Sequence, residues 1–159
     1  MMTRPRNNGF SLIELLIVVA IILVIAAIAI PSLMRSKIAA NEASAVGSMR
    51  TINTAFTSYA LTYGGGFPAS LSDLGPSSSP SSTAADLLDA VLITGIKSGY
   101  TFSYSPGPAG SNGLITSYSI TANPIAPGSS GQRGFFTDQS LVIRVNATGT
   151  ASSTDSPIS

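Results

Sequence analysis

The sequence GFSLIELLIVVAIILVIAAIAIPSLM occupies residues 9–34, and the rest of the chain is organised around it. Every residue from Leu15 to Ile30 is apolar, and Glu14 is the single charged residue of the segment. A helix that crosses a bilayer needs roughly 20 mostly apolar residues, so this segment is long enough to span a membrane. A carboxylate in such a helix costs roughly 2.5–3.5 kcal/mol at the bilayer centre and less near an interface. Glu14 must therefore lie near the lipid headgroups or meet a partner.

Two simpler interpretations of the segment stay open. A secretory signal peptide also has a basic start, here Arg4 and Arg6, an apolar core and a small-residue cleavage site such as the AIA at residues 27–29. The apolar run is longer than the roughly 7–15 residues of such a peptide, which counts against removal of the whole segment. The other alternative is an uncleaved anchor, in which Ser11 and Glu14 form a capping box at the start of the helix.

The residues from Gly9 to Val19, GFSLIELLIVV, resemble the prepilin signature of type IV pilins and type II secretion pseudopilins. A short basic leader ends in glycine, a phenylalanine follows, and Glu14 is the fifth residue after the bond between Gly9 and Phe10. A long apolar run that contains Pro31 completes the pattern. The resemblance covers about the first 35 residues of the chain.

The resemblance implies a processing step and an assembly step. A membrane prepilin peptidase would cut between Gly9 and Phe10 and methylate the new amino group of Phe10. Glu14 would guide assembly into a helical filament of like subunits, with the help of inner-membrane machinery. Physical chemistry favours this role, because the amine of a neighbouring copy at Glu14 would remove an unpaired charge from lipid. The chain would cross the inner membrane once, in contact with lipid, before it joins an extracellular or periplasmic filament.

The apolar pattern does not stop at Pro31, where we expect a kink in the helix. Apolar residues recur at helical spacing in the following segment, at Ile38, Ala45, Met49, Ile52, Phe56, Tyr59 and Tyr63. We therefore predict one continuous helix from about Phe10 to about Tyr63, which the glycines at 64–66 end. Its first half is apolar on all sides, and its second half is amphipathic.

The remainder of the chain predicts a small antiparallel sheet. Alternation at residues 100–105 is typical of a strand, and we expect further strands at 114–122, 135–137 and 141–145. We predict a short helical turn at 69–74, a short helix at 84–93 and a disordered tail at 150–159. The fold class is α+β and pilin-like, a long N-terminal helix packed on this sheet. Its parts are a leader (1–9), a transmembrane and assembly half-helix (10–34), an amphipathic half-helix (35–63) and a globular domain (64–159).

The composition argues against an enzyme. The chain has no cysteine and no histidine, so it lacks the commonest metal ligands and the commonest general base. We predict no catalytic residues, no cofactor and no metal site, and we interpret Asp86 and Asp89 as solvated surface residues rather than a calcium site. The formal charge of +1 comes without a basic stripe, so nucleic acid is not indicated as a partner. We expect Arg133 and Asp138 to have structural roles, Arg133 in pairing with a carboxylate or carbonyl and Asp138 in a turn.

The sequence therefore predicts a structural subunit of a type IV pilus-like filament, processed by prepilin peptidase and assembled through its N-terminal helix. Two alternatives stay open. The first alternative is a pseudopilin of a type II secretion system. The second is a membrane-anchored extracellular binding domain whose leader stays attached.

Overall fold

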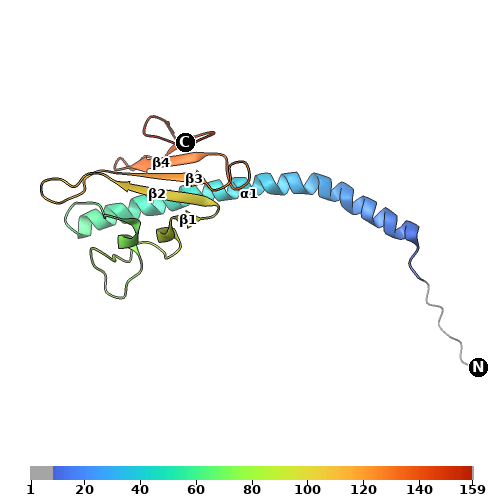
Figure 1. The fold of residues 1–159 in the computed structure, drawn as a ribbon, viewed down its shortest axis with the longest axis horizontal. Helices are drawn as coiled ribbons and strands as arrows, with labels where there is room; N and C mark the ends of the chain where they lie inside the picture. The colour runs from blue at the N-terminus through green and yellow to red at the C-terminus, as the bar shows by residue number, and fades with distance from the viewer. Residues whose placement is uncertain (1–8, 159) are drawn as a thin grey trace, which may run out of the picture. The chain divides into compact units, whose positions relative to one another are not determined.

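The computed structural model describes residues 9–158, which contain one long helix followed by one antiparallel sheet (Figure 1). The predicted α+β fold is confirmed. The leader residues 1–8 lie outside the described part of the chain. Helix α1 covers Leu12–Thr62 with Pro31 inside it, close to the predicted bounds. The chain divides into two compact units after Ser36, and each is described by itself below.

Helix α1 ends because the glycines that follow it adopt a backbone conformation that other residues rarely adopt. Gly64 and Gly65 have φ angles of 95° and 86°, which place both in the left-handed region. The N–H of Gly65 donates to the carbonyl of Ala60 at 2.7 Å, the bond that closes a Schellman-type helix end. The predicted termination at these glycines is confirmed.

The sheet is an antiparallel meander in the order β1-β2-β3-β4-β5-β6, as the short connections predicted. Its strands are β1 (Ile96–Lys97), β2 (Tyr100–Pro106), β3 (Tyr118–Pro124), β4 (Gly134–Asp138), β5 (Arg144–Asn146) and β6 (Ser156–Pro157). The longest pairing joins β2 to β3, from Tyr100 opposite Pro124 to Pro106 opposite Tyr118. Figure 1 shows β2, β3 and β4 lying along the part of α1 that follows Lys37.

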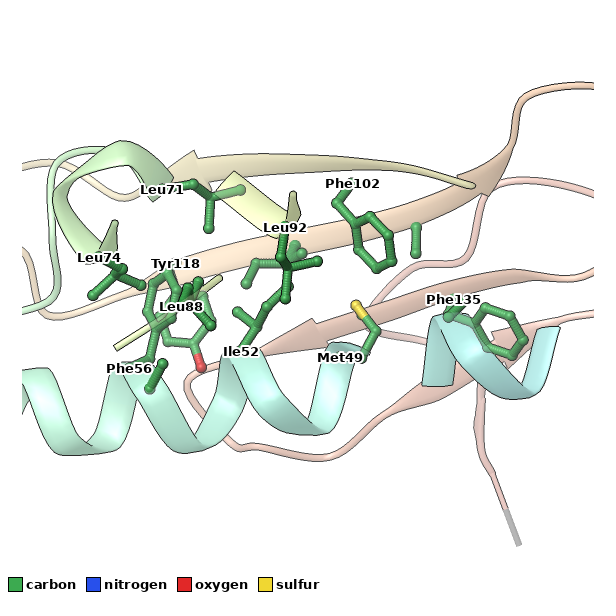
Figure 2. Close-up of a cluster of buried hydrophobic side chains, with 14 of the residues drawn as sticks. Met49, Ile52, Phe56, Leu71, Leu74, Leu88, Leu92, Phe102, Tyr118 and Phe135 are labelled. Atoms are coloured by element: carbon green, nitrogen blue, oxygen red, sulfur yellow. The ribbon is translucent and has the colours of Figure 1, made fainter. Parts of the chain in front are cut away.

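The core of the second unit lies between α1 and this sheet. Figure 2 shows Met49, Ile52 and Phe56 of α1 pointing at side chains from the strands and from the segment between helix and sheet. The strand residues in this cluster include Tyr100, Phe102, Tyr118, Ile120 and Phe135, and the intervening segment adds Leu71, Leu74, Leu88 and Leu92. Each large apolar side chain buried here contributes about 1.5–3 kcal/mol relative to exposure. The amphipathic stripe predicted for the helix therefore fixes the sheet to α1.

The prediction of a helix at residues 84–93 is wrong. The structure has short 3-10 helices at η1 (Leu71–Leu74) and η2 (Leu92–Thr94), so the predicted turn at 69–74 is confirmed. Asp86 has a φ of 53°, which a right-handed helix does not allow. The N–H groups of residues 85–88 instead donate to the carbonyls of residues 73–75 at 2.8–2.9 Å. Residues 84–88 therefore form a strap hydrogen-bonded to η1 and to Gly75. Leu88 in this strap and Leu92 in η2 are buried as expected.

Two predicted strands are shorter or displaced. Residues 114–117 do not form the start of β3, because the carbonyls of Leu114, Ile115 and Ser117 accept from Gly110, Phe67 and Gly107 outside the sheet. The strand predicted at 141–145 begins only at Arg144, because Leu141 has a φ of 63°.

The end of the chain is also ordered against expectation. Within the described residues, Ala151 is buried and β6 pairs with β5. The N–H of Ile158 donates to the carbonyl of Ile143 at 3.0 Å, and Arg144 Nη1 donates to the carbonyl of Asp155 at 2.9 Å. The disordered tail predicted at 150–159 is therefore wrong as far as residue 158. Small polar residues can form a sixth strand because β5 offers them an unpaired edge.

Candidate assembly segment at the N-terminus

The first turn of α1 is closed by Ser11 and Glu14. The backbone N–H of Ser11 donates to Glu14 Oε2 at 2.9 Å, and the N–H of Ile13 donates to Ser11 Oγ at 3.3 Å. These bonds satisfy two donors that the helix start leaves free, much as in a capping box. Within residues 9–158, Glu14 Oε1 accepts no hydrogen bond and no cation lies at ion-pair distance from either oxygen. Glu14 thus faces the peptide that follows Phe10 and keeps the capacity to bind a further donor.

The surface of α1 from Leu15 to Ile30 is apolar on every side. Phe10 is 83% exposed, and no residue of the most apolar part of α1 is buried. The large apolar side chains exposed along this segment are Leu12, Ile13, Leu15, Leu16, Ile17, Val18, Val19, Ile21, Ile22, Leu23, Val24, Ile25, Ile28, Ile30, Leu33 and Met34. By length and composition, α1 can cross a membrane. Water does not stabilise such a surface, so lipid or other apolar helices must cover it.

Pro31 lies inside α1 rather than at its end. A proline in this position removes one backbone hydrogen bond and crowds the preceding turn. The kink expected from it stays a prediction.

Asp86 and Asp89, weighed above as a calcium pair, have separate surroundings. Asp89 Oδ1 accepts from the N–H of Leu92 at 2.6 Å, and Asp89 Oδ2 forms an ion pair with Lys97 Nζ at 3.1 Å. The Leu92 N–H and then the Lys97 ammonium hold the pKa of Asp89 below its ordinary value. Asp86 is exposed, and its carboxylate accepts only a long bond of 3.4 Å from the N–H of Ser77. Across residues 9–158 the structure contains no group of three acidic side chains that could hold a metal ion.

Sequence reasoning missed the role of Glu42, a nearly buried carboxylate on α1. Glu42 Oε1 accepts from the N–H groups of Gln132 and Arg133 at 3.0 and 3.1 Å, and Oε2 accepts from Arg133 Nε at 2.7 Å. Burial alone would raise the pKa of Glu42, but these donors outweigh burial and hold the pKa below its ordinary value. The expected pairing of Arg133 with a carboxylate is thus confirmed. The available signal was an acidic residue at the edge of the apolar stripe.

Asp138 has the structural role that the sequence indicated. Its Oδ1 accepts from the N–H of Ser140 at 2.9 Å, and its carbonyl accepts from the N–H of Leu141 at 2.9 Å. These bonds close the turn after β4, so Asp138 stabilises the connection to β5.

A comparison with protein families places a similarity in the same N-terminal region. The family described as "Prokaryotic N-terminal methylation motif" matches residues 4–30. The chain is also 46% identical over 55 residues to the type IV major pilin protein PilA of Myxococcus xanthus (strain DK1622). That match covers 35% of this chain and 25% of PilA, so the chain spans about a quarter of the length of this relative. No solved structure matches the chain.

The matched motif contains the bond between Gly9 and Phe10, Glu14 and the apolar start of α1. The fold adds a long helix whose later part packs on an antiparallel sheet. The motif, the similarity to a major pilin and this fold agree with one another. The chain therefore carries the N-terminal methylation motif and is similar to a type IV major pilin over 55 residues.

Proposed function

We propose that the chain is a structural subunit of a type IV pilus-like filament, processed by prepilin peptidase and assembled through α1. In this proposal the peptidase cuts between Gly9 and Phe10 and methylates the new amine of Phe10. The processed chain then waits in the inner membrane and enters an extracellular or periplasmic filament of many copies, with the help of inner-membrane assembly machinery. It acts as a building element, without catalysis.

One observation carries this proposal: the start of α1 exposes apolar side chains on all sides around a single carboxylate. In the membrane, lipid would cover those side chains. In a filament, the same segments of neighbouring copies would cover one another, so transfer from lipid would expose little apolar surface to water. Glu14 would then meet the amine of Phe10 from a neighbouring copy, and the pair would remove an unpaired charge from an apolar surrounding.

Each part of the chain would have its own role. Residues 1–9 form the leader that is removed, and residues 10–34 serve in lipid and then in the filament core. Residues 35–63 form the half of the helix that holds the globular domain, which comprises residues 64–159. The proposed contact between Glu14 and the amine of Phe10 joins one surface of a copy to a different surface of the next copy. Contacts between unlike surfaces build open helical filaments.

The decisive experiment combines N-terminal analysis with isolation of surface filaments. Mass spectrometry and N-terminal sequencing of the mature chain should find a start at an N-methylated Phe10. Filaments sheared from cells should contain this chain. A chain that keeps residues 1–9 would contradict the proposal and favour the membrane-anchored binding domain. A processed chain found in periplasmic assemblies and absent from sheared filaments would favour a pseudopilin of a type II secretion system.

A further inference from the structure

Within residues 9–158, the sheet-bearing unit has two exposed cations, Lys37 and Arg50, and one exposed carboxylate, Asp86, that form no ion pair. Among the described residues, its ion pairs are Glu42 with Arg133 and Asp89 with Lys97. Arg50 on α1 and Asp86 on the strap are both exposed, and neither lies at ion-pair distance from an opposite charge in residues 9–158. An exposed charge alone does not indicate a contact, so the residues around Arg50 and Asp86 must be considered.

Arg50 lies at the rim of an open groove of about 410 Å³. The groove is lined by residues from α1, from the connection before β5 and from the end of the chain, namely Arg50, Asn53, Thr54, Leu141, Val142, Ile143, Pro157 and Ile158. Its lining combines apolar side chains with the polar residues Arg50, Asn53 and Thr54, and it lies at the β5–β6 edge of the sheet.

Leu141 is held in this groove in an unfavourable conformation. Its φ of 63° is uncommon for a bulky residue, and its side chain is 45% exposed. The buried amide of Asn53 fixes it, because Asn53 Nδ2 donates to the Leu141 carbonyl at 3.1 Å and to Thr137 Oγ1 at 3.1 Å. The fold thus keeps an apolar side chain at the surface beside a free cation.

The opposite edge of the sheet shows the complementary features. Asp86 also has a left-handed backbone, and its N–H donates to the Gly75 carbonyl at 2.9 Å, so the strap presents its carboxylate on a fixed backbone. Two large apolar side chains are exposed in this part of the chain, Val91 before η2 at 55% and Ile96 in β1 at 54%. Because β1 and β6 are opposite ends of the sheet order, one copy cannot join these two surfaces to each other.

We propose that the groove beside Arg50 receives the strap of a second copy of this chain, with Asp86 of that copy facing Arg50. Acidic and apolar groups on one edge would meet basic and apolar groups on the other. The contact joins two different surfaces, so a pair of copies keeps one free groove and one free strap, and the contact propagates. This inference rests on the proposed function, since it names a contact between the globular parts of neighbouring subunits.

The position of the strap along α1 sets the expected offset between the two copies. Tyr59 Oη donates to the Ser82 carbonyl at 2.7 Å, so the chain two residues before the strap lies beside Tyr59, nine residues after Arg50. At 1.5 Å per residue, contact between the strap of one copy and Arg50 of the next requires a shift of roughly 13 Å along the helix. Successive copies would therefore be staggered in the direction in which a filament grows.

The chain has no cysteine, so engineered disulfides give a direct test in intact filaments. A full-length chain with Arg50→Cys and Asp86→Cys should form, on mild oxidation, a ladder of covalent multimers. Each single variant should stay monomeric, because the contact joins unlike surfaces. The matched control combines Arg50→Cys with Ser103→Cys on the exposed face of β2, and it should give no ladder. Filaments without a ladder from the double variant would overturn the contact and leave the proposed function standing.

Charge exchange tests the same pair without cross-linking. Arg50→Glu and Asp86→Lys should each lower the yield of sheared filaments severalfold at low salt, and less at high salt because exposed charges are screened. The chain with both substitutions should recover most of the yield, because the pair is restored in reverse. Reduced yield in both single variants without recovery in the double variant would overturn the pairing. A wild-type chain that keeps its leader and forms no filament would overturn the proposed function, and this contact with it.

Discussion

Helix α1 carries two carboxylates, and their surroundings differ in every respect. Glu42 is 6% exposed, and two backbone N–H groups and the Arg133 guanidinium satisfy it. Glu14 lies among exposed apolar side chains and accepts one hydrogen bond, from Ser11 at the start of its own helix. A carboxylate satisfied within its own chain stabilises the fold, whereas a carboxylate left with free capacity in an apolar surrounding is suited to a partner.

The apolar side chains of the two parts of α1 follow the same division. Phe56 is fully buried and contacts Tyr104 and Tyr118 with ring centroids 5.1 and 4.5 Å apart. Leu16, in the first part, is 61% exposed. Sequence hydrophobicity is higher in the first part, yet the packed core lies in the second. The first part of the helix therefore has an exposed apolar surface and the second part has a packed one. Substitutions in the two parts should change different measurements.

The largest effect is expected from removing the charge of Glu14. Glu14→Gln keeps an oxygen that can accept from the Ser11 N–H, but it removes the negative charge that we propose attracts a neighbouring amine. We expect the variant to be processed and to remain in the membrane, while the yield of sheared filaments falls about tenfold or more. Immunoblots of membranes and of sheared filaments measure the two quantities.

Ser11→Ala is the matched control for Glu14→Gln. It removes the bond between Ser11 Oγ and the Ile13 N–H while keeping the carboxylate, and it should give near-normal filament yield. If Ser11→Ala abolished filaments and Glu14→Gln did not, Glu14 would be a helix cap alone, and the difference between the two carboxylates would lose its meaning.

The next largest effect separates the two parts of α1 by stability. Phe56→Ala should lower the free energy of unfolding of the sheet-bearing unit by about 3–5 kcal/mol, because it leaves a cavity among aromatic rings. Leu16→Ala should change that free energy by less than about 0.5 kcal/mol. Leu61→Ala, at an 82% exposed position of the same helix, is the control within the sheet-bearing unit. Denaturant unfolding of the full chain in detergent, followed by near-UV circular dichroism, measures all three. Equal losses in Leu16→Ala and Phe56→Ala would contradict the division.

Sequence periodicity predicts the elements whose structure is set by local spacing. Alternation at Tyr100, Phe102 and Tyr104 gave β2, and the helical stripe through Met49 and Phe56 gave the packed face of α1. The residues that we propose act in processing and assembly also lie in a short contiguous motif, so the sequence alone could name Gly9, Phe10 and Glu14 as candidates.

Periodicity fails where distant backbone groups decide the conformation. The strap at residues 84–88 has helical apolar spacing, but its N–H groups find the carbonyls of residues 73–75 instead of those one turn back. Leu141 leaves the strand region because Asn53, on another element, holds its carbonyl. The pairing of Glu42 with Arg133 joins residues 91 apart in sequence. No local pattern contains these partners, so no local rule could predict them.

A smaller effect is expected from Glu42 itself. Glu42→Gln keeps one acceptor oxygen but loses the charge and one of the two oxygens that accept hydrogen bonds. We expect the free energy of unfolding of the sheet-bearing unit to fall by about 1–3 kcal/mol, with normal processing at Phe10. Thermal unfolding of the full chain in detergent measures the change, and Asp86→Asn, at an exposed position whose carboxylate accepts only one long hydrogen bond, is the control for charge alone. An unchanged melting temperature in Glu42→Gln would mean that Glu42 does not fasten the loop before β4.

The smallest effect is expected on the stability contribution of Glu42 when the pH is lowered. Because the pKa of Glu42 is lower in the folded chain than its ordinary value, its charge stabilises the fold above that value, and this contribution disappears as pH falls through the folded pKa. The stability difference between the wild type and Glu42→Gln should therefore stay constant between about pH 7 and 5 and shrink below about pH 4.5. The groups that face Glu42 are Arg133, which keeps its charge throughout this range, and the Tyr100 hydroxyl, whose pKa burial raises to about 12. Neither group titrates in this window, so the shrinkage reports Glu42 alone. A stability difference that grew on acidification would mean that burial, and not the hydrogen-bond donors, sets the pKa of Glu42. Glu42 would then resemble Glu14, as a carboxylate whose charge its own chain does not satisfy.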